Sequence, residues 1–90
     1  MVSVFVQLVR AQVDLDRRLR HGDALIVEER AALRDGELFV AESGAGAWIG
    51  RYAAGTDPFW MYSLEAGVPE SLPRDAVHVR GAVIGVRSAI

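Results

Sequence analysis

The amino-acid sequence predicts an all-β fold, built as one mainly antiparallel, curled sheet or partly open barrel of about six to seven short strands. Three observations carry the prediction. Short runs of apolar, often β-branched residues recur along the chain, clusters of glycine, proline and aspartate separate these runs, and no alternation of strands with helices is present. The 90 residues suffice for one small domain, residues 1–90, with a thin core.

The first strand is expected over residues 2–9. Valine and leucine at the even positions alternate with the odd positions, as a half-buried strand requires. The second face carries few polar residues, which suggests partial cover on that side too. The run is short, has no basic flank and is interrupted by Ser3 and Gln7, so it fits neither a membrane span nor a signal peptide.

Residues 10–23 carry alternating charges and few large apolar side chains. Leu15 and Leu19 are four residues apart, which leaves open either one helical turn or an irregular crossover. The segment ends in a turn at His21-Gly22-Asp23, because glycine accepts a positive φ and an aspartate side chain bonds the neighbouring backbone.

Five further strands are expected, at residues 24–28, 37–42, 47–53, 59–64 and 76–89. Turns at Asp35-Gly36 and at residues 43–46 separate the first three of these. Two prolines hold residues 65–75 as an extended loop that cannot join a sheet interior. Gly81 and Gly85 inside the last strand predict a bulge or a strong coil there.

The composition of the chain argues against several classes of function. A net charge of −2 gives no long-range attraction to phosphate, so direct DNA binding is not expected. Without cysteine the chain has no disulfide, which fits a cytoplasmic location. The only histidines, His21 and His78, are read as a surface turn residue and a strand residue, and neither a metal site nor a cofactor is expected. Hydrophobic residues make up 51% of the chain, so some of them are expected at a subunit interface.

Five segments resemble, in order, elements of the LexA/UmuD-type domain, a serine–lysine self-cleaving fold. These segments are residues 19–27 (I-x-D-G-D-x-L-x-V in the family), 35–41 (x-G-D/Q-x-V-V-A), 48–52 (T-V-K-R/K-L), 61–69 (L-x-P-x-N-x-x-Y/F-x-P) and 79–86 (V-x-G-x-V-x-x-V/I). The resemblance covers about residues 5–88. It implies the LexA/signal-peptidase-like fold.

The sequence departs from the family where activity would lie. Val13 stands at the position that corresponds to the nucleophilic serine, and Gly50 stands at the position of the lysine that takes its proton. All ten basic residues are arginine, and the neighbouring Arg51 cannot act as the base because a guanidinium stays protonated. We therefore expect a domain that is not an enzyme. A residual peptidase or ligand-binding barrel that uses Ser43 or Ser63 is the alternative.

Two surfaces are candidates for binding. Domains of the family dimerise through their C-terminal strands, and the resemblance therefore implies a homodimer interface at Val83, Ile84, Val86, Ser88 and Ile90. The second candidate is a partner patch made of Arg17, Arg18, Arg20 and Trp60, since arginine forks suit carboxylate or phosphate partners. Solvated arginines with internal ion pairs are the competing interpretation for this patch. Phe59 and Trp60 are consecutive, so on a strand at least one of them should be exposed or at an interface.

The sequence thus favours a non-catalytic, homodimeric module that binds another protein. The resemblance implies a role in the DNA-damage (SOS) response or in phage and repressor regulation, with an error-prone polymerase, a recombinase filament or a LexA-type repressor as partner. A purely structural dimer in a larger assembly remains open. No membrane partner is expected.

Overall fold

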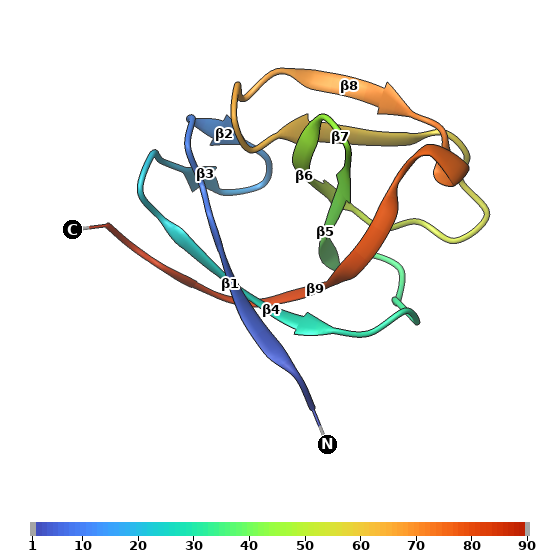
Figure 1. Cartoon of the computed structure of the whole chain (residues 1–90), viewed down its shortest axis with the longest axis horizontal. Helices are drawn as coiled ribbons and strands as arrows, with labels where there is room; N and C mark the ends of the chain where they lie inside the picture. The colour runs from blue at the N-terminus through green and yellow to red at the C-terminus, as the bar shows by residue number, and fades with distance from the viewer. Residues whose placement is uncertain (1, 90) are drawn as a thin grey trace.

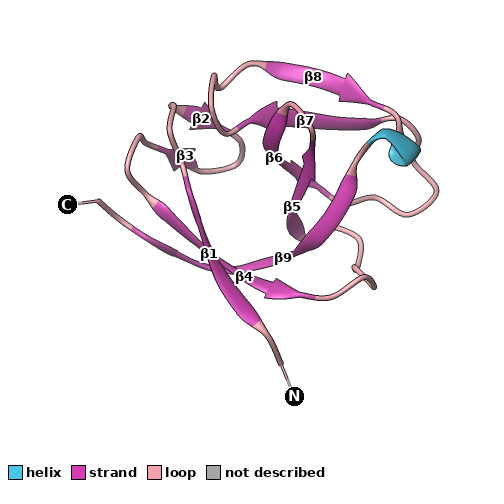
Figure 2. Cartoon of the chain, in the orientation of Figure 1, coloured by secondary structure: helices cyan, strands magenta, loops and turns pink. Residues whose placement is uncertain are grey.

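The computed structural model describes residues 2–89 and confirms the all-β prediction (Figure 2). The strands are β1 (Val4–Leu8), β2 (Val13–Asp14), β3 (Arg18–Leu19), β4 (Ala24–Glu29), β5 (Leu38–Ser43), β6 (Gly46–Arg51), β7 (Phe59–Ser63), β8 (Pro69–Leu72) and β9 (His78–Arg87). One turn of 3-10 helix, η1 (Arg74–Ala76), precedes β9. Within residues 2–89 no helix has the length and apolar character needed to cross a membrane.

Seven strands form one antiparallel sheet in the order β1-β4-β9-β5-β6-β7-β8, and β2 pairs only with β3. The sheet curls on itself, so that β1, β4 and β9 lie across from β7 and β8 (Figure 1). It does not close into a barrel, because β1 and β8 are its two edges and do not pair with each other. Both edges therefore stay available for other contacts.

The curl originates in β9, which pairs with β5 through its first half and with β4 through its second half. Its register shifts twice. Arg80 is the extra residue between the positions opposite Val40 and Ala41, and Ile84 is the extra residue between the positions opposite Ile26 and Val27. Each bulge adjoins one of the two glycines, so the predicted bulges are confirmed at both places.

Two hydrophobic clusters lie on opposite faces of the sheet. The inner cluster, enclosed by the curl, consists of Val9, Val13, Leu19, Leu25, Val27, Val40, Ile49 and Leu64. The outer cluster, on the other face of β5, β6 and β7, consists of Phe39, Ala41, Trp48, Phe59 and Met61. Alternation along β6 divides its side chains, since Trp48 belongs to the outer cluster and Ile49 to the inner one.

Residues 10–23 form a crossover with a very short hairpin, and the helical-turn alternative is wrong. Val13 and Leu19 face each other across β2 and β3, and both are fully buried in the inner cluster. The turn that follows is as predicted: Gly22 has a φ of 94°, and the Asp23 carboxylate accepts the backbone N–H of Arg20 at 2.9 Å. The hairpin thus covers an open end of the curled sheet.

The prediction of a loop over residues 65–75 is wrong in part, because Pro69–Leu72 form the edge strand β8. Pro69 opens that strand, and an edge position does not need a proline N–H for the ladder. The prolines do keep the segment out of the sheet interior, as expected.

Candidate interaction surface

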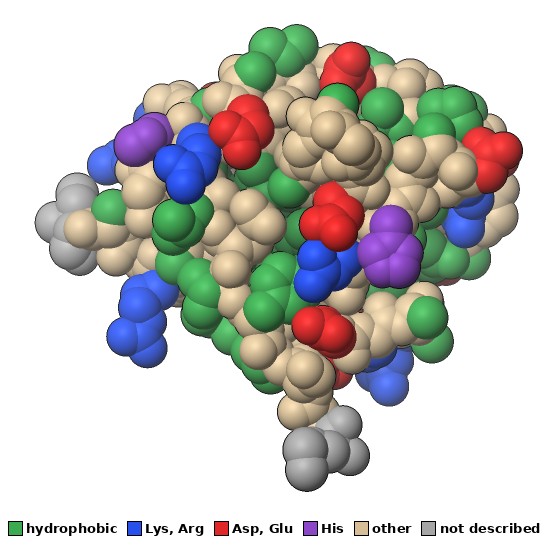
Figure 3. Space-filling view, viewed as in Figure 1, with side chains coloured by type: hydrophobic (Ala, Val, Ile, Leu, Met, Phe, Trp, Pro, Cys, Tyr) green, Lys and Arg blue, Asp and Glu red, His purple; other side chains and the backbone are tan. Residues whose placement is uncertain are grey.

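A group of exposed apolar side chains lies on the outer face of the adjacent strands β1, β4 and β9. On β1, Val4, Val6 and Leu8 are 49%, 58% and 46% exposed, and Ile84 on β9 is 54% exposed. Ile26 of β4 lies between them, because it pairs with Val6 on one side and with Gly85 on the other. These five residues, Val4, Val6, Leu8, Ile26 and Ile84, are called the outer strip. Figure 3 shows hydrophobic side chains gathered over β1 and β4.

The local register explains why the outer strip faces solvent. Phe5 packs against the inner cluster, and its β4 partner Val27 is part of that cluster. The side chains of a strand alternate between faces, so burial of the odd positions of β1 turns the even positions outward. Each face of β1 is apolar enough to be buried, but only one lies over the inner cluster. A contiguous exposed apolar patch of this kind marks an interaction surface.

The backbone of β1 presents its free edge at the same residues. At the two ends of the pairing, the Glu29 N–H donates to Ser3 O (2.8 Å) and the Val9 N–H donates to Asp23 O (2.9 Å). Hydrogen-bonded pairs alternate along an antiparallel ladder, so Phe5 and Gln7 bond to β4. The peptide groups of the even residues of β1 therefore point away from β4, where the strand has no neighbour among residues 2–89.

The residues predicted to form a dimer interface on the C-terminal strand differ in their exposure to solvent. Ile84 and Ser88 are exposed, whereas Val83 and Val86 are half-buried against the inner cluster. Ile90 lies outside the described residues. Residues 83–87 pair with β4 along one side only, because the pairing of β9 with β5 ends at Ala82. Ile84 is thus the member of the predicted set that belongs to the outer strip.

The arginines of the predicted partner patch line a cleft of about 270 Å³, together with Asp23, Val86 and Ser88. Arg18 pairs with Asp14 at 3.1 Å, as the competing interpretation of internal ion pairs expects. The Asp23 carboxylate accepts the backbone N–H of Arg20 (2.9 Å) and of Ala89 (3.0 Å), and these bonds lower the pKa of Asp23. This carboxylate ties the end of the chain after β9 to the turn before β4.

Trp60 lies apart from that cleft. It is 59% exposed and lines a separate hollow of about 320 Å³ with Tyr62, Leu15, Asp14, Asp16 and Arg51. Phe59 is buried, so the prediction that these two consecutive aromatic residues separate is confirmed. Trp48 lies in the outer cluster and donates its indole N–H to Glu70 at 3.3 Å. Trp48 and Trp60 therefore do not stack, because they occupy opposite faces of the sheet.

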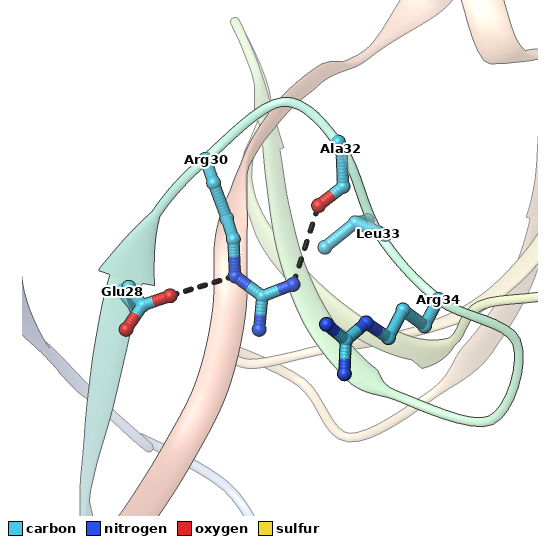
Figure 4. A pocket seen from close by; sticks show the side chains of 5 residues that line it. All are labelled: Glu28, Arg30, Ala32, Leu33 and Arg34. Carbon is cyan, nitrogen blue, oxygen red and sulfur yellow. Dashed lines mark hydrogen bonds and ion pairs between the residues drawn. The ribbon is translucent and has the colours of Figure 1, made fainter.

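A third hollow, of about 410 Å³, lies beside the loop after β4 and is lined by Glu28, Arg30, Ala32, Leu33 and Arg34 (Figure 4). Arg30 donates to Glu28 at 2.8 Å and makes a two-pronged pair with Glu37 at 2.8 and 2.5 Å. Arg30 is thus paired with two carboxylates of its own chain. We assign the hollow a structural role, in which Arg30 ties the loop to the start of β5.

The ion pair between Arg30 and Glu37 predicts how the free energy of unfolding depends on pH. The Arg30 guanidinium, assisted by the backbone N–H of Arg34, lowers the pKa of Glu37 from 4.5 to about 2. A carboxylate with a depressed folded-state pKa stabilises the fold above its unfolded-state pKa, and this contribution is lost as the pH falls to about 2. We expect Glu37→Gln to lower the urea midpoint near neutral pH and to leave it unchanged near pH 2. Urea unfolding followed by circular dichroism measures this.

Glu65→Gln is the control for that prediction, because Glu65 is exposed and has no ion pair among the described residues. It should leave the midpoint unchanged at both pH values. An equal loss from Glu37→Gln at both pH values would contradict the assignment.

The positions that correspond to the catalytic dyad face different parts of the protein. Val13 is fully buried in the inner cluster. A side chain at Gly50 would meet Trp60 O at 3.0 Å and the side chain of Met61, which belongs to the outer cluster, at 3.2 Å. A side chain at position 50 would therefore enter the outer cluster, on the side of β6 that faces away from Val13 in the inner cluster.

Ser43 and Ser63, the serines of the peptidase alternative, stabilise turns. The Ser43 hydroxyl accepts the Ala45 N–H at 3.1 Å, and the Ser63 hydroxyl accepts the N–H groups of Glu65 and Ala66 at 3.2 and 3.1 Å. Neither hydroxyl bonds to a titratable side chain in the part of the chain that the structure describes. The histidines are also separate, since His21 lies in the turn before β4 and His78 begins β9.

No protein-family model and no curated protein matches the chain. The resemblance to LexA/UmuD-type domains therefore stays a prediction from the five sequence segments.

Proposed function

We propose that this chain is a non-catalytic, LexA/UmuD-like protein-interaction module that acts as a homodimer and docks through its outer strip. One observation carries the proposal. One continuous face carries four apolar side chains that are each about half exposed, namely Val4, Val6, Leu8 and Ile84. Only the opposite face of β1 packs against the inner cluster. Water contact at such a patch is unfavourable, and cover by a second protein surface removes it.

The absence of a dyad supports the non-catalytic part. A serine–lysine mechanism needs a hydroxyl and a neutral amine side by side, and the corresponding positions hold Val13 and Gly50 on opposite sides of β6. The chain has no lysine at any position.

The sequence resemblance supports the cellular role. An accessory subunit of an error-prone polymerase, or a factor that binds a LexA-type repressor or a recombinase filament in the cytoplasm, needs a docking face and no catalysis. Affinity purification of the protein from damaged and undamaged host cells distinguishes between these candidate partners. Recovery of the chain alone would favour a structural dimer instead.

A charge in the outer strip tests the proposal. Val6→Asp places a carboxylate without a partner in the buried interface, which costs about 3 kcal/mol or more and corresponds to a dimer Kd raised on the order of 100-fold. We expect light scattering after size-exclusion chromatography to report a monomer for this variant and a dimer for the unmodified chain.

Val68→Asp is the matched control, because Val68 is 56% exposed, close to the 58% of Val6, but lies in the loop between β7 and β8. It should remain dimeric. The proposal is wrong if Val68→Asp and Val6→Asp have the same mass, or if the unmodified chain is monomeric at all concentrations.

A further inference from the structure

The free edge of β1 exposes apolar side chains and outward backbone groups at the same residues. Val4, Val6 and Leu8 expose apolar side chains, and their backbone N–H and C=O groups point away from β4. An apolar surface alone can bind a helix, a loop or a lipid. A row of outward peptide groups at strand spacing is satisfied by another extended strand.

We propose that two copies of this chain pair antiparallel through their β1 edges, with Val6 opposite Val6 of the second copy, so that the two sheets become one continuous sheet. The proposal rests on the homodimer proposed above and specifies its geometry. Val4, Val6 and Leu8 of the outer strip then meet their counterparts across the new strand pair, whereas Ile84, two strands away from this edge, lies outside the contact.

The register follows from the positions of the outward groups. A two-fold axis at Val6 pairs Val4 with Leu8 of the second copy and Leu8 with Val4, so that every outward residue of β1 has a partner inside β1. An axis at Phe5 would leave Leu8 opposite residue 2, outside the strand. An axis at Gln7 would leave Val4 opposite residue 10, also outside it.

The chemistry of the strand favours a second copy as its occupant. Residues 2–9 contain no charged side chain, so two copies bring no like charges together across the pair. The opposed side chains are valine with valine and valine with leucine, which are favourable cross-strand pairs. The Gln7 side chain donates to Leu8 O at 3.2 Å, but a carbonyl oxygen has a second lone pair for the partner strand.

Proline at position 6 tests the edge pairing separately from the apolar contact. Val6→Pro removes an outward N–H and leaves the bonds from Phe5 and Gln7 to β4 in place, since an edge strand tolerates a proline whose nitrogen faces solvent. We expect this variant to be monomeric by light scattering with an unchanged circular dichroism spectrum. Val6→Thr is the control, because it keeps the N–H and a β-branched side chain, and it should stay dimeric.

Failure of the edge pairing is distinguishable from failure of the homodimer. If Val6→Pro stays dimeric while Val6→Asp is monomeric, the copies meet through the outer strip without joining their sheets, and the edge proposal is wrong. If the unmodified chain is a monomer, the homodimer itself is wrong.

Single-cysteine variants report the register of the β1–β1 pair. Their results hold whether or not the proline variant folds. The chain has no native cysteine, so any disulfide joins two copies. Hydrogen-bonded antiparallel pairs hold their Cα atoms about 5.5 Å apart, within the range of a disulfide. Val6→Cys should therefore form a covalent dimer on oxidation. Val4→Cys should not, because its two copies are roughly 14 Å apart, four residues along the strand.

An equimolar mixture of Val4→Cys and Leu8→Cys should form the mixed dimer, which non-reducing electrophoresis detects with mass spectrometry. Rapid cross-linking of Val4→Cys alone, or none of Val6→Cys, would overturn the register. Capture of a foreign extended peptide by β1 in a monomeric chain would assign the edge to another occupant.

Discussion

Gly81→Ala is expected to lower the free energy of unfolding by about 3 kcal/mol or more. A Cβ atom at Gly81 would lie 2.0 Å from Glu28 O and 2.8 Å from the Glu28 carbonyl carbon. Both are backbone atoms of β4, which cannot move aside because β4 is paired with β1 and β9. The φ of +157° at Gly81 adds strain for any residue with a side chain. The bulge at Arg80 thus depends on the glycine that follows it.

Gly85→Ala is the matched control, because Gly85 adjoins the second bulge of the same strand. The nearest atom to its Cβ would be Ile26 Cγ1 at 3.7 Å, an ordinary contact. We expect a change within about 0.5 kcal/mol. Urea unfolding followed by tryptophan fluorescence measures both variants. Equal losses from the two variants would contradict this account of how β9 bends.

Phe39→Ala is expected to lower the free energy of unfolding by about 3–5 kcal/mol. The ring is fully buried at the centre of the outer cluster, with its centroid 5.0 Å from that of Phe59 and 5.8 Å from that of Tyr52 in edge-to-face arrangements. Truncation would leave a cavity against both rings.

Val68→Ala, at an exposed position, is the control and should change stability by less than about 0.5 kcal/mol. Chemical denaturation compares the two. A loss below about 1 kcal/mol for Phe39→Ala would mean that the outer cluster rearranges and fills the space.

Much of the fold follows from local patterns in the sequence. Alternating apolar residues predicted β1, a short apolar run predicted β4, and the glycine turns at residues 22 and 36 have the positive φ that the prediction requires. The glycines of β9 predicted its bulges. Patterns fail where elements are too short, since β2 and β3 have two residues each and carry no periodicity. They also fail at β8, where proline is compatible with an edge strand as well as with a loop.

The candidate surface was predicted only in part. Ile84 belongs to the predicted C-terminal interface and to the outer strip. Val4, Val6 and Leu8 were missed, because alternation identifies two faces of a strand without saying which one is buried. That choice depends on pairing of Phe5 with Val27, a contact between strands that local sequence does not encode. The arginine cleft and Trp60 were predicted as one patch, and the structure separates them.

The most direct test of the central claim, that a second copy contacts the outer strip along β1, is an isotope-filtered NOE measurement. One half of the sample carries labelled methyl groups and the other half is unlabelled, so that only contacts between copies give signals. We predict such contacts at the methyl groups of Val4, Val6 and Leu8 and none at Val68. A spectrum without contacts between copies at the outer strip, or with contacts only around Trp60, would contradict the claim.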